Sequence, residues 1–540
     1  MRPSTLRRVS VSPSESEERP APISQGKSRF DVVALIITFA AVVVYVQHAW
    51  AYRALFLGNA VDDAYISFRY LENLATGHGL VYNPGERVEG FSNLLWILLL
   101  YPFRLAGMDV VRTSQFLGIG FGAATIVLAV IAARRLFEAR SWISTVFVAF
   151  LPATSGYFAA WSIGGLEGNL YAFLMLAAWF FYFDESEKQR RFPISALLLA
   201  LLAMTRPEGL FIALAGAGYV LGTKYLSGQS LKDPKVWRFL LVLGVCLGLY
   251  EVFRVIAYGP HLFPNSVRAK VGLSFASIER GIEYVHDRFA SPYLILLAPL
   301  AFVVRRNRYV ALAPAAVLVG AAIALVVVAG GDWSFGRLFA PCLPLGAVAM
   351  VGVMREIVGE DSTWDAYVPK AVGSLLVVGY LGFAWYVTGK LGERKFFGPF
   401  AQYDAERIRI GRWLKENAPK DAKVGVYAAG EIPYFSGLYA HDMLGLNDAH
   451  IAAKEVPSLG KGIAGHEKSD PDYTLNVVKP DVIVDGYLVP GLREHPDFAK
   501  NYEQLPGFRF NAVHVKTNLV DSLMPTIPGL GAKSPDSDEP

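Results

Sequence analysis

Two adjacent carboxylates, Asp62 and Asp63, are the residues of this chain whose types and spacing best suit chemistry. They follow a long apolar stretch and precede an amphipathic segment, residues 64–75. A carboxylate beside an apolar environment can act as a general base and deprotonate a hydroxyl group. Helix capping is the structural alternative, but a cap needs only one acid, so the pair favours a chemical role.

Three cations in separate polar segments suit the binding of a phosphate group: Arg206, Lys270 and Arg337. Guanidinium and ammonium groups bind phosphate oxygens and stabilise the charge of a phosphate leaving group. Glu208 closely follows Arg206, and Asp332 precedes Arg337, so a structural ion pair is the alternative for each arginine. Lys270 is the strongest phosphate candidate of its own loop.

Further polar residues of the same segments are weaker candidates for contacts with a substrate. Glu167 could instead cap a helix, and polar residues are ordinary in long loops. An interfacial aromatic belt is the expected role of the aromatic residues Tyr65, Tyr70, Tyr82, Trp96, Trp161 and Trp333, with sugar stacking as the alternative. The weaker candidates are Tyr65, Asn83, Glu89, Asn93, Glu167, His261, Asn265, Asp332 and Asp442.

The sequence predicts no metal site. His441 and His466 show no metal-ligand spacing and are expected on the surface. Acids near a phosphate would permit a divalent cation but do not require one. Gly-rich phosphate loops and nucleophilic serine motifs are also missing from the sequence.

Composition places these residues in a membrane protein. Of the 540 residues, 53% are hydrophobic and 18% are charged, whereas about 25% are charged in soluble domains. The formal net charge of +4 indicates no polyanionic partner such as nucleic acid. Two cysteines exclude a disulfide scaffold. Membrane lipids are therefore the first expected partners.

Eleven apolar stretches are long enough, or nearly so, to span a bilayer. A further stretch, residues 91–105, is short and ends in Pro102 and Arg104, which predicts an interfacial or re-entrant helix. The expected spans are residues 32–49, 113–133, 142–158, 168–183, 193–205, 209–222, 238–256, 291–304, 309–328, 338–354 and 370–387.

Basic residues between the spans predict the orientation of the chain. With a cytosolic N-terminus, the loops rich in lysine and arginine fall on the cytosolic side, in agreement with the positive-inside rule. Counting residues 91–105 as a span would invert every later loop and destroy that pattern. The polar segments with the candidate residues then lie outside, where their carboxylates and cations are expected to converge in one site.

Four regions follow from this organisation. Residues 1–30 are expected to be a disordered cytosolic tail, and residues 31–389 a transmembrane domain. Residues 390–520 are expected to form a small extracytoplasmic α/β domain, and residues 521–540 a flexible tail. The α/β domain should contain one amphipathic helix and several strand-like runs, at residues 401–417, 424–429, 481–484 and 512–516.

Paired carboxylates with nearby cations at a membrane face describe glycosyl transfer from a lipid-linked phosphosugar. The lipid tail of such a donor would stay in the bilayer while its head reaches the external face. Residues 62–70, 79–93 and 206–209 resemble those of the membrane-embedded GT-C glycosyltransferases. The likeness is greatest to the terminal arabinofuranosyltransferase family of mycobacterial cell walls, AftB, and it extends to residues 264–266, 269–270, 331–333, 337 and 442–448.

The resemblance implies a polytopic α-helical membrane protein of GT-C type, with about eleven transmembrane helices and a small C-terminal extracytoplasmic α/β domain. It also implies a polyprenyl-phosphate sugar as the donor and a central role for Asp62 and Asp63. Which of the two acids is the base stays open at this point.

The expected function is transfer of a sugar, with arabinofuranose as the expected sugar, to a cell-envelope glycan. The site would face outwards from a bacterial inner (plasma) membrane. A transporter or flippase of lipid-linked sugars and a non-catalytic envelope assembly factor are the alternatives. A transporter would place polar residues within its spans, whereas the spans here are largely free of them, which favours the enzyme.

Overall fold

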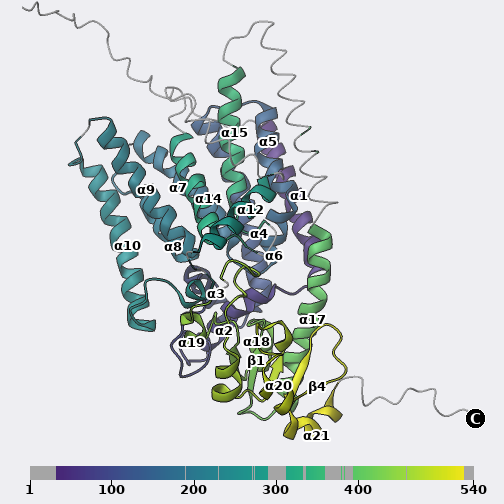
Figure 1. Cartoon of the computed structure of the whole chain (residues 1–540). Coiled ribbons are helices and arrows are strands. Elements are labelled where there is room, and N and C mark those ends of the chain that lie inside the picture. The colour runs from purple at the N-terminus through teal and green to yellow at the C-terminus, as the bar shows by residue number, and fades with distance from the viewer. Residues whose placement is uncertain are drawn as a thin grey trace, which may run out of the picture.

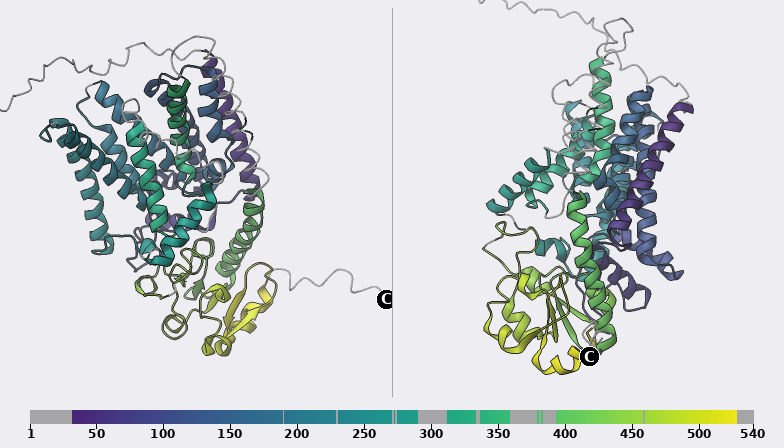
Figure 2. Two further views of the ribbon diagram at one scale, coloured as in Figure 1. Left: turned by 45° about the horizontal axis from the view of Figure 1, so that its top comes forward. Right: turned by 90° about the vertical axis from the view of Figure 1, so that its right-hand side faces the viewer.

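The computed structural model describes residues 32–188, 190–228, 230–270, 272, 274–289, 312–332, 336–358, 379, 382, 393–457 and 459–527. Within these ranges the chain forms a helical part and a smaller part that contains a β-sheet (Figure 1). The long helices run side by side, and the sheet lies beyond one end of them (Figure 2).

Among the described residues, four helices are each long and apolar enough to cross a membrane: α1 (Val32–Leu55), α4 (Val110–Leu136), α9 (Pro207–Leu226) and α10 (Pro234–Tyr258). Large apolar side chains of these helices, such as Phe39 and Leu249, are exposed on the protein surface. Exposed apolar side chains on a long apolar helix are typical of a helix that faces lipid. The helical part is therefore polytopic.

Shorter helices complete the helical part. α5 (Trp142–Thr154) and α6 (Gly156–Ile163) meet at a bend of 52°, so the expected span at residues 142–158 is broken at Ser155. The Ser155 hydroxyl accepts a hydrogen bond from the backbone N–H of Phe158 (3.3 Å) and so caps α6. The remaining helices that match expected spans are α7 (Gly168–Glu187), α8 (Ile194–Thr205), α14 (Leu312–Val328) and α15 (Leu343–Val358), with η2 (Ala340–Cys342) before α15.

Each expected span that falls on described residues coincides with one or two helices. The expected spans at 291–304 and, apart from residues 379 and 382, at 370–387 lie outside the described residues, as does the expected tail at 1–30.

A layer of short helices separates the long helices from the sheet (Figure 1). It includes α2 (Asp62–Ala75), α3 (Leu94–Leu105) and α11 (Asn265–Lys270), whereas α12 (Phe275–Phe289) packs against α14. The 12 residues of α3 extend for about 18 Å, which is well short of a bilayer core of about 30 Å. This length agrees with the predicted interfacial helix at residues 91–105.

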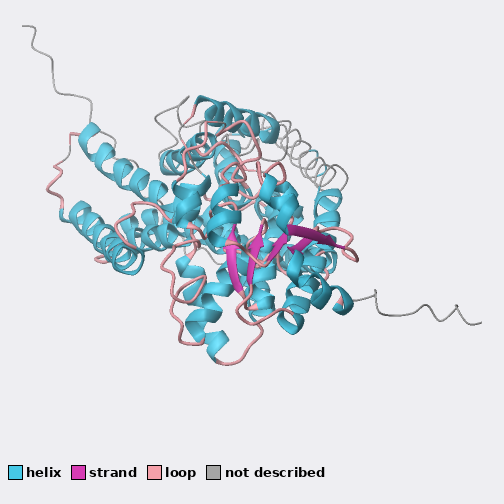
Figure 3. Cartoon of the chain, turned by 60° about the horizontal axis from the view of Figure 1, so that its bottom comes forward, coloured by secondary structure: helices cyan, strands magenta, loops and turns pink. Residues whose placement is uncertain are grey.

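The smaller part is an α/β domain that begins with a long helix, α17 (Glu393–Asn417). Its five-stranded sheet, magenta in Figure 3, has the order β2-β1-β3-β5-β4. β1 pairs in parallel with β2 and β3, whereas β5 is antiparallel to β3 and β4. The strands are β1 (Lys423–Val426), β2 (Tyr439–Asp442), β3 (Val482–Val484), β4 (Tyr502–Leu505) and β5 (Val513–Lys516); the helices beside them are α18 (Glu431–Ser436), α19 (Ala449–Ala453), α20 (Pro496–Asn501) and α21 (Val520–Leu523).

The expected tail at residues 521–540 begins too early. α21 ends at Leu523, and Leu523 and Ile527 are both buried against the hydrophobic core. Burial of these apolar side chains holds the segment on the domain. Residues 528–540 lie outside the described residues.

The aromatic residues near α2 do not form an interfacial belt. Tyr65, Tyr70, Tyr82 and Trp96 are each at most 2% exposed. Tyr65 packs against Tyr434 of α18 with ring centroids 5.3 Å apart, so the α/β domain covers α2 on the side expected to face lipid headgroups. Trp161 is also buried, and Trp333 lies outside the described residues.

A buried arginine of α2 joins the two parts of the molecule. The Arg69 guanidinium donates to the carbonyl oxygens of Leu438 (2.7 Å) and Pro433 in the α/β domain. It also donates to the Tyr82 carbonyl (2.7 Å) and the Asn83 side chain (3.0 Å) in the loop after α2. One cation thus satisfies acceptors from both parts, and α2 belongs structurally to the interface.

We predict that Arg69→Met weakens the docking of the α/β domain. The change leaves several buried acceptors without a donor, which should cost about 3 kcal/mol or more of unfolding free energy. Thermal unfolding of the purified protein in detergent measures the loss. Arg493→Met, at an exposed position of the α/β domain, is the matched control and should change stability by at most about 0.5 kcal/mol. Equal melting temperatures of the two variants would contradict the prediction.

Candidate active site

A cavity of about 650 Å³ lies between the helical part and the α/β domain. Its wall combines α2, the loop before α3, the junctions before α7 and α9, α11, the end of α14 and the segment after it, and a loop of the α/β domain. Seven residues singled out from the sequence line it together: Asp63, Asn93, Glu167, Arg206, Lys270, Asp332 and Arg337.

Asp63 forms an ion pair with Arg337 across the cavity wall, with the Oδ2 and Nη1 atoms 2.5 Å apart. Arg337 also binds both carboxylate oxygens of Asp332, at 3.0 and 3.2 Å, so two acids share one guanidinium. Burial alone would raise the pKa of Asp63, but Arg337 and then Lys270 outweigh that effect and hold the pKa well below its usual range. Asp63 is therefore ionised at neutral pH.

Arg206 lies between two carboxylates in the same cavity. Its guanidinium binds Glu167 at 2.9 Å and Glu208 at 3.1 Å. Glu167 in turn accepts a hydrogen bond from Asn93 (2.7 Å), whose side-chain oxygen accepts one from Ser67 (2.9 Å). Glu167 occupies the N-cap position of α7 without a side-chain capping bond, so its carboxylate serves this network and not the helix end.

Lys270 is the last residue of α11. No carboxylate of the described residues lies within 4.0 Å of its ammonium group. The α/β domain holds its aliphatic stem: Gly465 has a φ of +79°, and a Cβ there would lie only 3.0 Å from Lys270 Cγ. Arg268 of the same helix also lines the cavity, and its guanidinium has no ion-pair partner among the described residues.

Asp62 turns away from the cavity and caps a helix of the α/β domain. Its carboxylate accepts hydrogen bonds from the backbone N–H groups of Gly430 (3.1 Å) and Glu431 (2.9 Å), at the start of α18. Only glycine fits at position 430, because a Cβ there would lie 1.8 Å from the Asp62 carbonyl oxygen. The N-cap of α2 itself is Val61, so neither acid caps its own helix.

Burial raises the pKa of Asp62, although Arg407 and the Glu431 N–H oppose the shift. Two neighbouring acids of nearly identical sequence context therefore lie in opposite electrostatic environments. Asp63, which faces the cavity, is the member of the pair that can meet a substrate.

Asp62 belongs to a buried acidic cluster at the interface with the α/β domain, formed with Asp404, Glu431 and Arg407. Arg407 binds Asp404 at 3.3 Å. Burial and then Asp62 raise the pKa of Asp404, against the opposing effect of Arg407. Burial, with Asp404 and Asp62 adding to it, raises the pKa of Glu431 well above its usual value.

Several expected substrate contacts lie outside the cavity lining and hold the interface between the two parts. Asn83 donates to the Ala440 carbonyl of β2 (2.9 Å) and accepts from the Ala440 N–H (3.1 Å). Asn265 donates to the carbonyl oxygens of Gly445 (2.9 Å) and Leu446 (3.1 Å). A side-chain amide can form hydrogen bonds with backbone groups or with the hydroxyl groups of a sugar. The sequence alone does not distinguish these two roles.

Three further candidates also lie away from the cavity lining. Glu89 forms a buried two-point ion pair with Arg254 of α10, with both Nε–Oε1 and Nη2–Oε2 at 2.8 Å. Tyr65 lies in the core, and His261 is exposed to solvent. The expected substrate role of these residues has no support from their placement.

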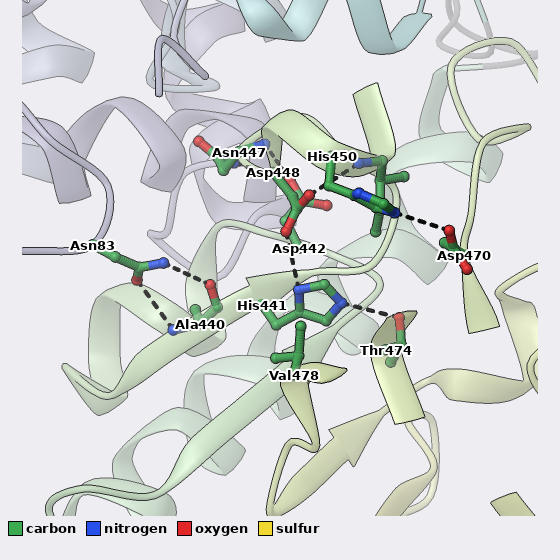
Figure 4. Close-up of polar contacts among 12 residues, drawn as sticks. Asn83, Ala440, His441, Asp442, Asn447, Asp448, His450, Asp470, Thr474 and Val478 are labelled. Carbon is green, nitrogen blue, oxygen red and sulfur yellow. Dashed lines mark hydrogen bonds and ion pairs between the residues drawn. The ribbon is translucent and has the colours of Figure 1, made fainter. Parts of the chain in front are cut away.

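Asp442 stabilises a turn of the α/β domain, as Figure 4 shows. Its carboxylate accepts from the backbone N–H groups of Leu444 (3.0 Å) and Asn447 (2.8 Å) and from the Asn447 side chain (3.0 Å). His441 beside it is 1% exposed and contacts Asp448 (3.3 Å) and Thr474 (3.0 Å), so it is a core residue and not the expected surface histidine.

The sequence did not single out every residue of the cavity wall. Arg268 lies between the chosen residues Asn265 and Lys270, and the hydroxyl groups of Ser67, Ser92 and Ser266 carry no distinctive spacing. Ala464 and Gly465 of the α/β domain gave no signal, because they meet the cavity only through the fold.

Among the described residues, no group of three or more His, Cys, Asp or Glu side chains is arranged to hold a metal ion. The cavity acids Asp63 and Asp332 instead share the Arg337 guanidinium. The charged side chains of this cavity therefore suit contact with an anion better than the binding of a metal cation.

Comparison with solved structures identifies the fold class. ArnT from Cupriavidus metallidurans, bound to undecaprenyl phosphate, superimposes with a TM-score of 0.53 at 14% identity, covering 89% of this chain and 97% of that chain. The oligosaccharyltransferase of Archaeoglobus fulgidus in its apo form gives a TM-score of 0.51 at 11% identity, over 92% and 78%. The chain thus has the predicted fold, a polytopic helical membrane fold of GT-C type with a small C-terminal α/β domain.

Two sequence relatives share one name. A protein of Corynebacterium glutamicum named terminal β-(1→2)-arabinofuranosyltransferase is 28% identical over 404 residues, covering 64% of this chain and 56% of that protein. Its namesake in Mycobacterium tuberculosis is 27% identical over 274 residues, covering 46% and 41%. The chain spans about half the length of these curated relatives. Residues 400–521 match a domain of unknown function, DUF8728.

The raised pKa of Asp404 predicts how stability depends on pH. The folded chain holds this proton more tightly than the unfolded chain, whose aspartates have a pKa of about 3.9. Stability should therefore fall as the pH rises from about 4 toward the raised pKa. Asp404→Asn should make that decline shallower in melting temperatures recorded from pH 4 to pH 8.

Asp472→Asn is the matched control for Asp404→Asn, because the Asp472 side chain is 80% exposed. This control should show the same dependence of melting temperature on pH as the unaltered protein. A decline in Asp404→Asn as steep as that of the control would show that Asp404 does not carry the effect.

Proposed function

We propose that this chain is a glycosyltransferase that moves a sugar from a polyprenyl-phosphate donor to a hydroxyl group of a cell-envelope glycan. Arabinofuranose is the proposed sugar, because the two sequence relatives are named arabinofuranosyltransferases. The site would lie at the external face of a bacterial inner membrane, the side on which the positive-inside rule puts the polar segments.

The observation that carries this proposal is the charge arrangement of one cavity. Four carboxylates and four cations line it, and they are unevenly paired. Arg337 and Arg206 each bind two carboxylates, whereas Lys270 and Arg268 have no ion-pair partner among the described residues. A phosphate that enters the cavity would meet these two cations without first breaking an ion pair.

Asp63 is the proposed base. As the C1–O bond to the donor phosphate breaks, the acceptor hydroxyl oxygen bonds to C1 and its proton passes to the Asp63 carboxylate. The bonding electron pair leaves with the polyprenyl phosphate, whose negative charge Lys270 and Arg268 stabilise. Asp63 is suited to receive the proton because it is ionised and lines the same cavity.

Donor binding would itself strengthen this base. The low pKa of Asp63 depends on Arg337 and Lys270, so Asp63 alone is a weak proton acceptor. A phosphate bound to Lys270 or Arg337 would neutralise part of that positive charge and add a negative charge nearby, and both effects raise the pKa of a carboxylate. The acid would then accept a proton only when a donor is present.

Arg206 has a supporting role in this scheme. Its guanidinium is held by Glu167 and Glu208, and the Asn93 amide fixes Glu167 from the loop before α3. The network joins α2, that loop and the start of α9 into one wall. We therefore assign donor phosphate binding first to Lys270, with Arg268 and Arg337 beside it.

We predict that Asp63→Asn lowers kcat by about 100-fold or more, because general-base catalysis contributes that much. Release of polyprenyl phosphate from purified protein and a panel of polyprenyl-phosphate sugars, followed by mass spectrometry, measures the rate. Asp62→Asn is the comparison variant, since it alters the neighbouring acid that caps α18, and it should be clearly less severe. Full activity of both variants would refute the role of this acid pair.

We predict that Lys270→Ala lowers kcat/KM for the donor by about 10- to 100-fold, as expected for loss of a hydrogen bond between charged groups. Lys270→Arg should restore part of the activity, because it keeps the charge. Lys420→Ala, at an exposed position, is the control. An unchanged kcat/KM for the donor in Lys270→Ala would show that the donor phosphate binds elsewhere.

The same assay separates the enzyme from a transporter or flippase. Purified protein in liposomes should release polyprenyl phosphate from its donor and elongate a glycan acceptor. Movement of the intact lipid-linked sugar across the bilayer, with no bond broken, would overturn the proposed function.

A further inference from the structure

A second cavity, of about 530 Å³, shares no lining residue with the candidate active site. It lies where the end of α1, the start of α4 and the α/β domain helices α17 and α18 meet. Three arginines line it, each from a different helix: Arg53 of α1, Arg112 of α4 and Arg412 of α17.

The charges of this cavity are strongly one-sided. Asp109 is the only acid among its lining residues, and its carboxylate accepts from the backbone N–H of Arg112 (2.8 Å) as the cap of α4. Arg53 is held by the Gln115 side chain (2.9 Å). The guanidinium groups of Arg112 and Arg412 have no ion-pair partner among the described residues. An anion would complement this excess of positive charge.

Exposed apolar side chains show that the cavity opens at the level of the membrane surface. Trp50 and Leu57 of the cavity wall are 49% and 61% exposed, and they end a helix apolar enough to span a bilayer. Leu105 and Met108, just before α4, are 59% and 48% exposed. Large exposed apolar groups beside arginines are typical of a protein surface at the headgroup layer.

We propose that this cavity binds the headgroup of an anionic phospholipid of the surrounding membrane. The phosphate contacts Arg112 and Arg412, and Arg53, which is held by Gln115 of α4, adds positive charge. The acyl chains lie along the exposed apolar face of α1, where Val43 is 37% exposed. Because Arg412 belongs to α17 and Arg53 to α1, one bound lipid links the α/β domain to the helical part.

Native mass spectrometry of the purified full chain in detergent tests this site. Phosphatidylglycerol and phosphatidylcholine with identical acyl chains are titrated separately, and phosphatidylglycerol should bind more tightly. An arginine near an anionic lipid surface contributes about fivefold to affinity, so Arg112→Ala combined with Arg412→Ala should weaken phosphatidylglycerol binding by about 30-fold. Arg412→Gln alone, at an exposed position of α17, should weaken it by about fivefold.

Two controls test whether the loss of lipid binding arises in this cavity. Arg493→Ala combined with Lys500→Ala removes two equally exposed cations of the α/β domain and should leave lipid binding unchanged. Lys270→Ala, in the candidate active site, should also leave it unchanged, which separates this site from donor binding. Millimolar inorganic phosphate should not displace the lipid, because the acyl chains contribute to binding.

Three results would overturn the proposal. Equal affinity for phosphatidylglycerol and phosphatidylcholine would remove the role of charge. Unchanged binding in both the double variant and Arg412→Gln would remove the role of these arginines. Displacement of the lipid by inorganic phosphate would show that the site takes a free anion. A loss of binding in either control as large as in the double variant would show that the lipid binds elsewhere.

Discussion

The docking of α2 between the helical part and the α/β domain is the contact on which the rest of the structure depends. At one end of α2, Asp62 holds the backbone of Gly430 and Glu431, and further along Arg69 holds Pro433 and Leu438. Successive helical residues differ by about 100° in direction, so fixing Asp62 on the α/β domain directs Asp63 into the cavity. A single helix orientation thus fixes one acid on the α/β domain and leaves the other facing the cavity.

The proposed anion site lies in a cavity that is lined by equal numbers of carboxylates and cations, which are unevenly paired. Arg337 and Arg206 are each shared by two carboxylates, which hold those two guanidinium groups in place. The excess positive charge remains on Lys270 and Arg268, at the side where Gly465 of the α/β domain supports the Lys270 stem. Both parts of the molecule therefore contribute to the proposed anion-binding wall, and neither part contains that wall alone.

Much of the fold could be predicted because its signals are local. Apolar runs gave the helices, and β-branched runs gave β1, β3 and β5, which lie in the middle of the sheet or next to it. The edge strands β2 and β4 were missed because edge strands carry fewer apolar residues, and the aromatic belt was wrong because α2 is covered by a domain more than 300 residues away in sequence. Long-range burial of this kind leaves no periodic trace in α2 itself.

The sequence by itself determined the membrane class, the helical spans on described residues and the set of polar segments from which the cavity residues come. Asp63, Lys270 and Arg337 carry charges that a mostly apolar chain would not keep without cause. Only the tertiary structure decided which of these residues meet. It separated Asp63 from Asp62, and it gave Asn83, Glu89, Asn265 and Asp442 partners within the protein. The physical reason is that an amide or carboxylate satisfies a buried backbone group as readily as a ligand, and only the surrounding chain determines which partner is present.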